Sequence, residues 1–173
     1  MDIGFLGDMR VLTTTSIIPI QEIDERSIIR QIDDRKRNIY MMFKCYTKNE
    51  LIGIKLKGMD KPLICGRDTE IMVNRNFGNR GKKRIYIKAI NILRRDRVVF
   101  ADRVGWGERK IERTFYVDLE IPRVQLFNLV IPKNEHYIVE GFLTRNLFHR
   151  GDKTIMNIHK MAGADIDERH FEE

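Results

Sequence analysis

Short runs in which every second residue is apolar recur along most of the chain. Residues 51–57 read L-I-G-I-K-L-K and residues 84–90 read R-I-Y-I-K-A-I, so apolar residues alternate over part of each run. Successive side chains of a β-strand point to opposite faces of a sheet, and this spacing therefore predicts strands. Segments of this kind, rich in Val, Ile, Tyr, Phe and Thr, predict strands at 9–14, 38–46, 51–57, 70–74, 84–93, 97–101, 112–121, 125–130 and 137–143.

Turn-forming residues separate these segments. Residues such as Gly, Asn, Asp and Pro occur at 47–50, 57–60, 77–81, 105–107 and 132–135. Nine short strands at intervals of about 10–15 residues favour an all-β architecture over a βαβ arrangement, in which helices would alternate with strands. Trp106 lies in one of these turns, and we expect it to anchor the turn in the core or at an interface.

Two stretches have a helical spacing instead. Residues 22–37 place Ile28, Ile29 and Ile32 toward one side after a candidate N-cap at Asp24, although they read equally well as a long charged loop. Residues 152–161 predict a short helix, and the chain after them is acidic. We therefore expect a β domain over 1–146 and a partly helical docking arm over 147–173.

The composition narrows the class of protein. The 173 residues are 42% hydrophobic and 33% charged, which is typical of one folded domain, alone or with a tail. No run approaches the ~20 apolar residues of a membrane-spanning helix, and Asp2 stands where a signal peptide would carry positive charge. We expect a protein that is not secreted and has no membrane span, with Cys45 and Cys65 reduced and used for packing.

Positive charge is concentrated in the middle of the chain. The net charge is +7, but residues 75–113 contain thirteen Lys or Arg and four acidic residues, a local net charge of +9. Such a stretch indicates an acidic partner, which can be a nucleic acid or an acidic protein surface. The residues that we expect to make this contact are Arg80, Lys82, Lys83, Arg84, Arg94 and Arg95. No pattern predicts a metal site, a cofactor or a small-molecule substrate.

Three blocks, in order, resemble the Hint modules of inteins and hedgehog-type autoprocessing domains. Residues 4–13 (G-F-L-G-D-M-R-V-L-T) and 19–23 (P-I-Q-E-I) resemble the opening block of that family. Residues 86–98 resemble its middle block, W-V-K-A-x-D-L-K-x-G-D-x-V, and residues 127–132 with 136–146 resemble its closing block. The resemblance implies a flat horseshoe of β-strands in which the first and last strands lie side by side.

The residues that the family uses for catalysis differ here. The resemblance places Gly4 where a Cys or Ser nucleophile stands, and aligns Gly66 and Thr69 with the Thr and His of a Thr-x-x-His motif. It places Asn128 at a position where the family often has an Asp, and Arg145-Asn146-Leu147 where it has His-Asn followed by Cys, Ser or Thr. Arginine is always protonated and cannot act as a base, and Leu147 cannot accept an acyl group. The inner His of the closing block aligns with Glu135, or with His136 in the neighbouring register.

We therefore expect a Hint-like module that is not an enzyme and that binds protein partners in a larger assembly. A free-standing basic module of this kind is similar to small structural proteins of large DNA viruses, so a minor capsid role is expected, in the virion or the cytoplasm. Two alternatives stay open. One is a nucleic-acid-binding protein that uses the basic 75–113 stretch, and the other is residual self-cleavage after Asn146.

Overall fold

The computed structural model describes residues 2–24, 28–30, 36–38, 41–131 and 136–145. The strands are β1 (Arg10–Leu12), β2 (Ile17–Pro19), β3 (Ile28–Arg30), β4 (Lys36–Asn38), β5 (Met41–Thr47), β6 (Leu51–Leu56), β7 (Leu63–Cys65), β8 (Glu70–Asn76), β9 (Lys82–Lys88), β10 (Arg97–Ala101), β11 (Trp106–Val117), β12 (Val124–Val130), β13 (His136–Val139) and β14 (Phe142–Arg145). Three short 3₁₀ helices are η1 (Ile20–Glu22), η2 (Gly78–Arg80) and η3 (Ala89–Asn91). The predicted all-β class is confirmed. No helix in the described ranges has the length and apolar character needed to cross a bilayer.

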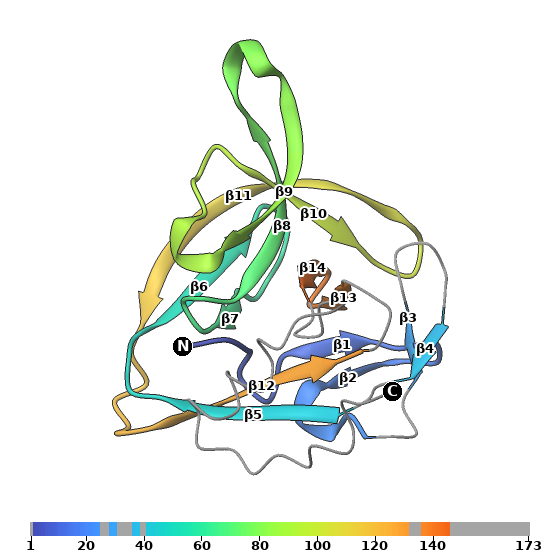
Figure 1. Ribbon diagram of the computed structural model, residues 1–173, viewed down its shortest axis with the longest axis vertical. Helices are drawn as coiled ribbons and strands as arrows, with labels where there is room; N and C mark the ends of the chain where they lie inside the picture. The colour runs from blue at the N-terminus through green and yellow to red at the C-terminus, as the bar shows by residue number, and fades with distance from the viewer. Residues whose placement is uncertain (1, 25–27, 31–35, 39–40, 132–135, 146–173) are drawn as a thin grey trace, which may run out of the picture.

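One large antiparallel sheet carries most of the strands. Its order is β2-β1-β13-β14-β8-β10-β11-β6-β7, with β9 paired to β8, and β12 pairs separately with β5 (Figure 1). The long β11 strand pairs with β10 through its first half and with β6 through its second half, with an irregularity between Ile111 and Arg113. The sheet bends along this strand, which joins its two parts into a curved frame (Figure 1).

The start and the end of the described chain lie side by side, as the resemblance implied. Val11 of β1 is paired with Val139 of β13, and β13 is followed directly by its hairpin partner β14. The main core fills the space inside the frame, and its fully buried side chains include Phe5, Ile71, Tyr137 and Phe142. Segments that are more than a hundred residues apart therefore meet around the first few residues.

The hairpin formed by β8 and β9 projects from this body (Figure 1). Seven consecutive cross-strand pairs, from Glu70 opposite Lys88 to Asn76 opposite Lys82, hold its two strands together. All residues from Asn76 to Arg84 are exposed, so the tip of the hairpin has no packing role.

Several predicted bounds are wrong. The strand predicted at 137–143 is a hairpin, because Glu140 and Gly141 have φ of 49° and 84° and form a tight two-residue turn. The strand predicted at 84–93 ends at Lys88, where η3 begins, and the strand predicted at 112–121 runs instead from Trp106 to Val117. Trp106 therefore begins a strand; it does not sit in a turn, and its side chain is 53% exposed.

The helix predicted over 22–37 is also wrong wherever this stretch is described. Ile28–Arg30 and Lys36–Asn38 form an antiparallel pair, and the fully buried Ile29 makes a β-bridge with Thr13. Neighbouring β-branched residues favour a strand, and contact with the core outweighs the weak helical spacing of the three isoleucines. The predicted helix at 152–161 and the arm at 147–173 lie outside the described residues.

Candidate functional site

The segment before β1 runs between β7 of the large sheet and β12 of the smaller one (Figure 1). Phe5 makes a β-bridge with Cys65 on one side and with Phe127 on the other. The Phe5 amide donates to the Phe127 carbonyl at 2.8 Å, and the Phe127 amide donates back to the Phe5 carbonyl at 2.8 Å. The amide of Gly66 donates to the Gly4 carbonyl at 2.9 Å. Gly4 is therefore fixed by backbone contacts on both sides.

The backbone around Gly4 leaves no room for a side chain. Its φ is +131°, a region that favours glycine, and a Cβ placed there would lie 2.7 Å from the Phe127 carbonyl oxygen. The nearest obstacle is backbone, which cannot rotate away as a side chain can. A Cys or Ser nucleophile would need this segment to adopt another path.

Gly66 is closed off in the same way. A Cβ at this residue would lie 2.3 Å from the carbonyl oxygen of Asp2. Asp2 is itself held in place: its carbonyl accepts from the Asp68 amide at 2.9 Å, and its amide donates to the Asp68 carboxylate at 3.0 Å. Its own carboxylate accepts from the Asn49 side chain at 2.7 Å. The segment before Gly4 occupies the space that a threonine at position 66 would need.

Thr69 contacts both backbone groups of Gly4. Its hydroxyl accepts from the Gly4 amide at 2.9 Å and donates to the Gly4 carbonyl at 3.1 Å, and the whole residue is buried. The resemblance implies a histidine here, which protonates the same amide nitrogen. The hydroxyl occupies the right place to hold that nitrogen, but it is not an acid or base near neutral pH.

Asn128 follows Phe127, the β-bridge partner of Phe5, and belongs to a buried polar group. Its Oδ1 atom accepts from the Tyr137 hydroxyl and from the Leu129 amide, the latter at 2.8 Å. Burial raises the pKa of Tyr137 well above its ordinary value, so both partners are neutral. The Tyr137 ring packs edge-on against Phe5, with ring centroids 6.2 Å apart. This group supports the core and carries no charge for catalysis.

Arg145 ends β14, the last described strand, which pairs with β8 through Thr144 and Ile71. Its Nη1 atom is 3.2 Å from a carboxylate oxygen of Glu70, and its guanidinium lies 5.4 Å from the centre of the Tyr86 ring. His136 is paired with Arg145 across β13 and β14. Asn146 and Glu135 lie outside the described residues.

The structure therefore brings Gly4, Gly66 and Thr69 into direct contact and places Arg145 beside Glu70. Two thiols adjoin this site: Cys45 Sγ donates to the Ile3 carbonyl at 3.3 Å, and Cys65 is fully buried next to Gly66. Burial raises the pKa of Cys45 to about 11 and that of Cys65 to about 12. A thiol of this kind stays protonated and packs as a small apolar group. Both cysteines are buried, as expected. Backbone contacts fill the site, and the groups that touch Gly4 are neutral.

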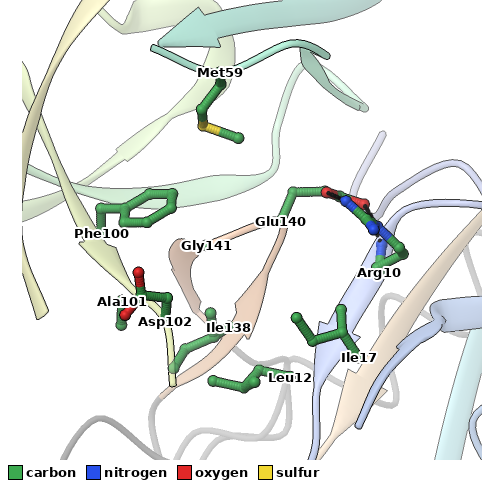
Figure 2. A pocket seen from close by; sticks show the side chains of 10 residues that line it. All are labelled: Arg10, Leu12, Ile17, Met59, Phe100, Ala101, Asp102, Ile138, Glu140 and Gly141. Atoms are coloured by element: carbon green, nitrogen blue, oxygen red, sulfur yellow. Dashed lines mark hydrogen bonds and ion pairs between the residues drawn. The ribbon is translucent and has the colours of Figure 1, made fainter. Parts of the chain in front are cut away.

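A cavity of about 180 Å³ lies between β1, the β13–β14 turn and β10 (Figure 2). Two of its three charged residues pair with each other: Glu140 accepts from Nε of Arg10 at 3.0 Å and from Nη2 at 3.1 Å. The third, Asp102, accepts from the backbone amides of Val104 and Gly105 at 2.9 and 3.0 Å. Most of the remaining lining is apolar, with Leu12, Ile138 and Phe100 facing the space. The cavity therefore has few polar groups that could bind or activate a charged substrate.

The predicted basic residues fall into two groups. Arg80, Lys82, Lys83 and Arg84 lie at the exposed tip of the β8–β9 hairpin, together with the 41% exposed ring of Phe77. Arg84 also lies over the Trp106 ring, 4.3 Å from its centre, and 3.9 Å from Glu108. Arg94 and Arg95 lie elsewhere, in the turn that leads into β10, beside Lys57 and Lys110. Lys57 and Lys110 were missed, because only the sheet register brings them near.

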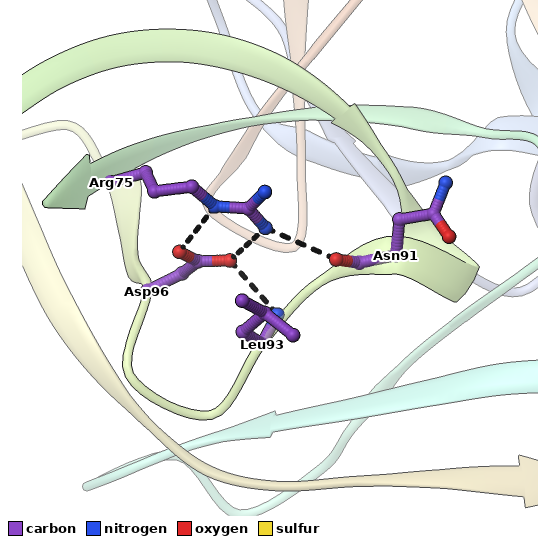
Figure 3. Close-up of polar contacts among 4 residues, drawn as sticks. All are labelled: Arg75, Asn91, Leu93 and Asp96. Carbon is purple, nitrogen blue, oxygen red and sulfur yellow. Dashed lines mark hydrogen bonds and ion pairs between the residues drawn. The ribbon is translucent and has the colours of Figure 1, made fainter. Parts of the chain in front are cut away.

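The basic stretch 75–113 is therefore not a single face. Arg75 turns inward to an ion pair with the buried Asp96 (Figure 3). Arg109 lies 4.1 Å from the centre of the Phe100 ring. Alternation along β9 and β11 sends neighbouring basic residues to opposite sides of the sheet. Among the described residues, no three His, Cys, Asp or Glu side chains are grouped in a way that could hold a metal ion.

Comparison with known proteins gives structural likeness only. No protein-family model and no curated protein matches the sequence. A bacterial intein-like domain from Clostridium thermocellum is similar, with a TM-score of 0.63, 16% identity and coverage of 83% of this chain and 97% of that one.

Two inteins are similar to the same extent. The DnaB intein from Synechocystis sp. PCC 6803 has a TM-score of 0.63 at 10% identity, and coverage of 84% of this chain and 99% of that one. The PabCDC21-1 intein has a TM-score of 0.66 at 12% identity, with 83% and 98% covered. The curved frame, the paired chain ends and these likenesses agree: the protein has the intein-like Hint fold.

Proposed function

We propose that this protein is a non-catalytic binding module built on the Hint fold. The observation that carries the proposal is the path of residues 2–5. They run through the site as a hydrogen-bonded segment. The Phe127 carbonyl fills the space that a side chain at position 4 would need, and the Asp2 carbonyl fills the space that one at position 66 would need. Acyl transfer needs a nucleophile beside the peptide bond that breaks, and glycine supplies none. The Cys45 thiol, which donates to the Ile3 carbonyl at 3.3 Å, stays protonated because burial raises its pKa to about 11. What remains is a rigid scaffold with exposed basic surfaces.

Incubation of the purified full chain tests this proposal. We expect the intact mass to stay constant at neutral pH, with and without a thiol reagent or hydroxylamine. Asn146→Ala is the matched control, because self-cleavage after Asn146 would yield a fragment from the wild type and none from the variant. Such a fragment would overturn the proposal in favour of residual autoprocessing.

We propose that the partner is an acidic protein in a larger assembly, such as a viral capsid. The exposed hairpin tip supports the acidic character of the partner. It carries Arg80, Lys82, Lys83 and Arg84, with no acidic residue between Asn76 and Arg84. Native mass spectrometry of the protein mixed with a candidate acidic partner gives the stoichiometry. A tip variant with all four residues changed to Gln is expected to lose the complex.

Nucleic-acid binding is the second candidate. The observation that favours it is the combination of aromatic and basic groups on and beside the hairpin: Phe77 at its tip, and Trp106 of β11 under Arg84. Stacking surfaces beside phosphate-binding cations are typical of single-strand binders. The slope of log Kobs against log salt tests it, because each phosphate contact on a single strand contributes about 0.7 to that slope. No salt-sensitive binding of an oligonucleotide would exclude this candidate.

A further inference from the structure

A second basic group, separate from the hairpin tip, lines a pocket beside the turn between η3 and β10. The pocket has a volume of about 230 Å³. Its charged lining residues are Lys57, Arg94, Arg95, Asp96, Arg97 and Lys110, which come from the end of β6, the turn, β10 and β11. All five basic residues are exposed, whereas Asp96 is buried.

Sheet register holds the basic residues in place. Arg97 of β10 is directly opposite Lys110 of β11, and the Lys57 amide donates to the Lys110 carbonyl at 2.9 Å. Residues opposite each other in an antiparallel pair share a face, with Cβ atoms about 4.5–5.5 Å apart. Like charges in that position destabilise a sheet. An anion bound between them would remove this repulsion.

The one carboxylate of the pocket is already neutralised. Asp96 Oδ1 accepts from Nε of Arg75 at 2.9 Å, and Oδ2 accepts from Nη2 of Arg75 at 2.7 Å (Figure 3). Oδ2 also accepts from the Leu93 amide at 2.8 Å, which closes the turn that carries Arg94 and Arg95. Arg75 comes from β8 and neutralises the charge of the Asp96 carboxylate from inside the fold. The two arginines of the turn, Arg94 and Arg95, stay exposed to solvent.

The neighbouring acidic residues are also paired elsewhere. Glu112 lies 2.8 Å from Lys55, and Glu108 accepts from the Asn74 side chain at 2.7 Å. Within the part of the chain that the structure describes, none of Lys57, Arg94, Arg95, Arg97 and Lys110 has a carboxylate within ion-pair distance. The pocket therefore keeps its positive charge.

We propose that this pocket binds a phosphate group. Three arginines and two lysines converge on a space large enough for a phosphate with part of the molecule that bears it. A phosphate offers several oxygens and up to two negative charges, so it can engage more than one planar guanidinium at once, which a single carboxylate cannot do as well. The phosphate can belong to a free polyphosphate compound or to a nucleic-acid backbone. This site goes beyond the proposed function and does not depend on the loss of catalysis.

Tripolyphosphate is the probe for the test, titrated by calorimetry into the full chain at about 0.1 M salt. We expect saturable binding that Arg94→Gln with Arg95→Gln weakens by about tenfold or more. The matched control is Lys48→Gln with Lys61→Gln, which removes the same charge from two exposed residues outside the pocket and should change the affinity by less than about twofold. Lys57→Gln with Lys110→Gln provides a second pocket variant on different elements. Circular dichroism verifies that each variant is folded.

Competition with a labelled oligothymidylate identifies the source of the phosphate. Displacement of the oligonucleotide by tripolyphosphate assigns the pocket to a backbone phosphate, and tripolyphosphate binding without oligonucleotide binding assigns it to a free compound. Three results would overturn the proposal: no saturable binding, equal losses in the pocket and control variants, or polyglutamate binding as tight as tripolyphosphate. The intact-mass test of autoprocessing is independent of all of these outcomes.

Discussion

At the scale of single residues, Gly4 and Gly66 stand at two positions that align with the family's catalytic residues. The backbone around each of them leaves no room for a side chain. A Cβ at Gly4 would lie 2.7 Å from the Phe127 carbonyl oxygen, and one at Gly66 would lie 2.3 Å from the Asp2 carbonyl oxygen. Gly4 also has a positive φ. Introducing the side chains that the family uses would therefore strain the fold. Because the surrounding backbone occupies the space, changing one of these glycines does not by itself build a catalytic site.

Gly4→Ala is expected to lower the free energy of unfolding by about 2 kcal/mol or more, from the strained φ and the contact with the Phe127 carbonyl. Gly4→Cys should be at least as destabilising and form no thioester. Urea denaturation measures the change. Gly105→Ala is the matched control, because nothing lies within 4 Å of its Cβ position, and it should stay within about 0.5 kcal/mol of the wild type. Equal stability of the two variants would contradict this account of Gly4.

We expect the buried Cys65 thiol to make the protein less stable at high pH. Burial raises its folded-state pKa to about 12, against about 8.5 in an unfolded chain. The unfolded state therefore releases its proton first, so the contribution of Cys65 is complete below pH ~8.5 and falls by about 1.4 kcal/mol per pH unit above it. Unfolding curves between pH 8 and 10.5 measure this fall. Cys65→Ser, which does not titrate there, should show a shallower dependence, and an identical slope in both proteins would rule out the role of the thiol.

At the scale of elements, the β8–β9 hairpin has two parts with different uses. Its base is structural, since Val73 is buried and Arg75 reaches Asp96 in the turn before β10. Its tip is exposed from Asn76 to Arg84. The exposed tip contributes nothing to the packing of the core, and the basic residues lie in this tip. Function at the tip and stability at the base can therefore be tested separately.

Arg75→Gln is expected to destabilise the protein by about 3–5 kcal/mol, because it leaves the Asp96 carboxylate buried without its cation. Denaturant unfolding measures the change. Asp96→Asn in the same chain should recover part of the loss, since a neutral amide removes the uncompensated charge. Lys61→Gln, at an exposed residue, controls for the loss of one positive charge and should cost less than about 0.5 kcal/mol. If Arg75→Gln costs no more stability than Lys61→Gln, the Arg75–Asp96 pair does not support the turn.

At the scale of the whole molecule, the all-β class and the pairing of the chain ends were predictable, but most contacts between distant segments were not. The alternation in residues 51–57 indicated β6, and the Val- and Phe-rich residues 97–101 indicated β10, both with nearly correct bounds. Residues 22–37 failed, because a few isoleucines at i, i+1 and i+4 fit a helix or a strand, and only the contact of Ile29 with the core decides between them. The pocket residues Lys57 and Lys110 are 53 positions apart, and no local pattern relates them.

The segment before β1 holds the two parts of the core together. Phe5 is fully buried, bridges β7 of the large sheet to β12 of the smaller one, and packs against Tyr137. A side chain in this position links segments from the beginning, middle and end of the described chain. If the molecule unfolds as one cooperative unit, a cavity at Phe5 must weaken regions that do not touch it.

Phe5→Ala is therefore expected to lower the free energy of unfolding by about 3–5 kcal/mol, through lost burial and the cavity left behind. Trp106 is the only tryptophan of the chain and lies at the start of β11, so its fluorescence reports on a distant part of the sheet. The fluorescence and far-UV circular dichroism midpoints should fall together. Phe77→Ala, at the exposed hairpin tip, removes the same ring and should change neither midpoint appreciably. A drop seen by circular dichroism but not by Trp106 would mean that the two sheets unfold separately, and that the segment before β1 stabilises only its own neighbourhood.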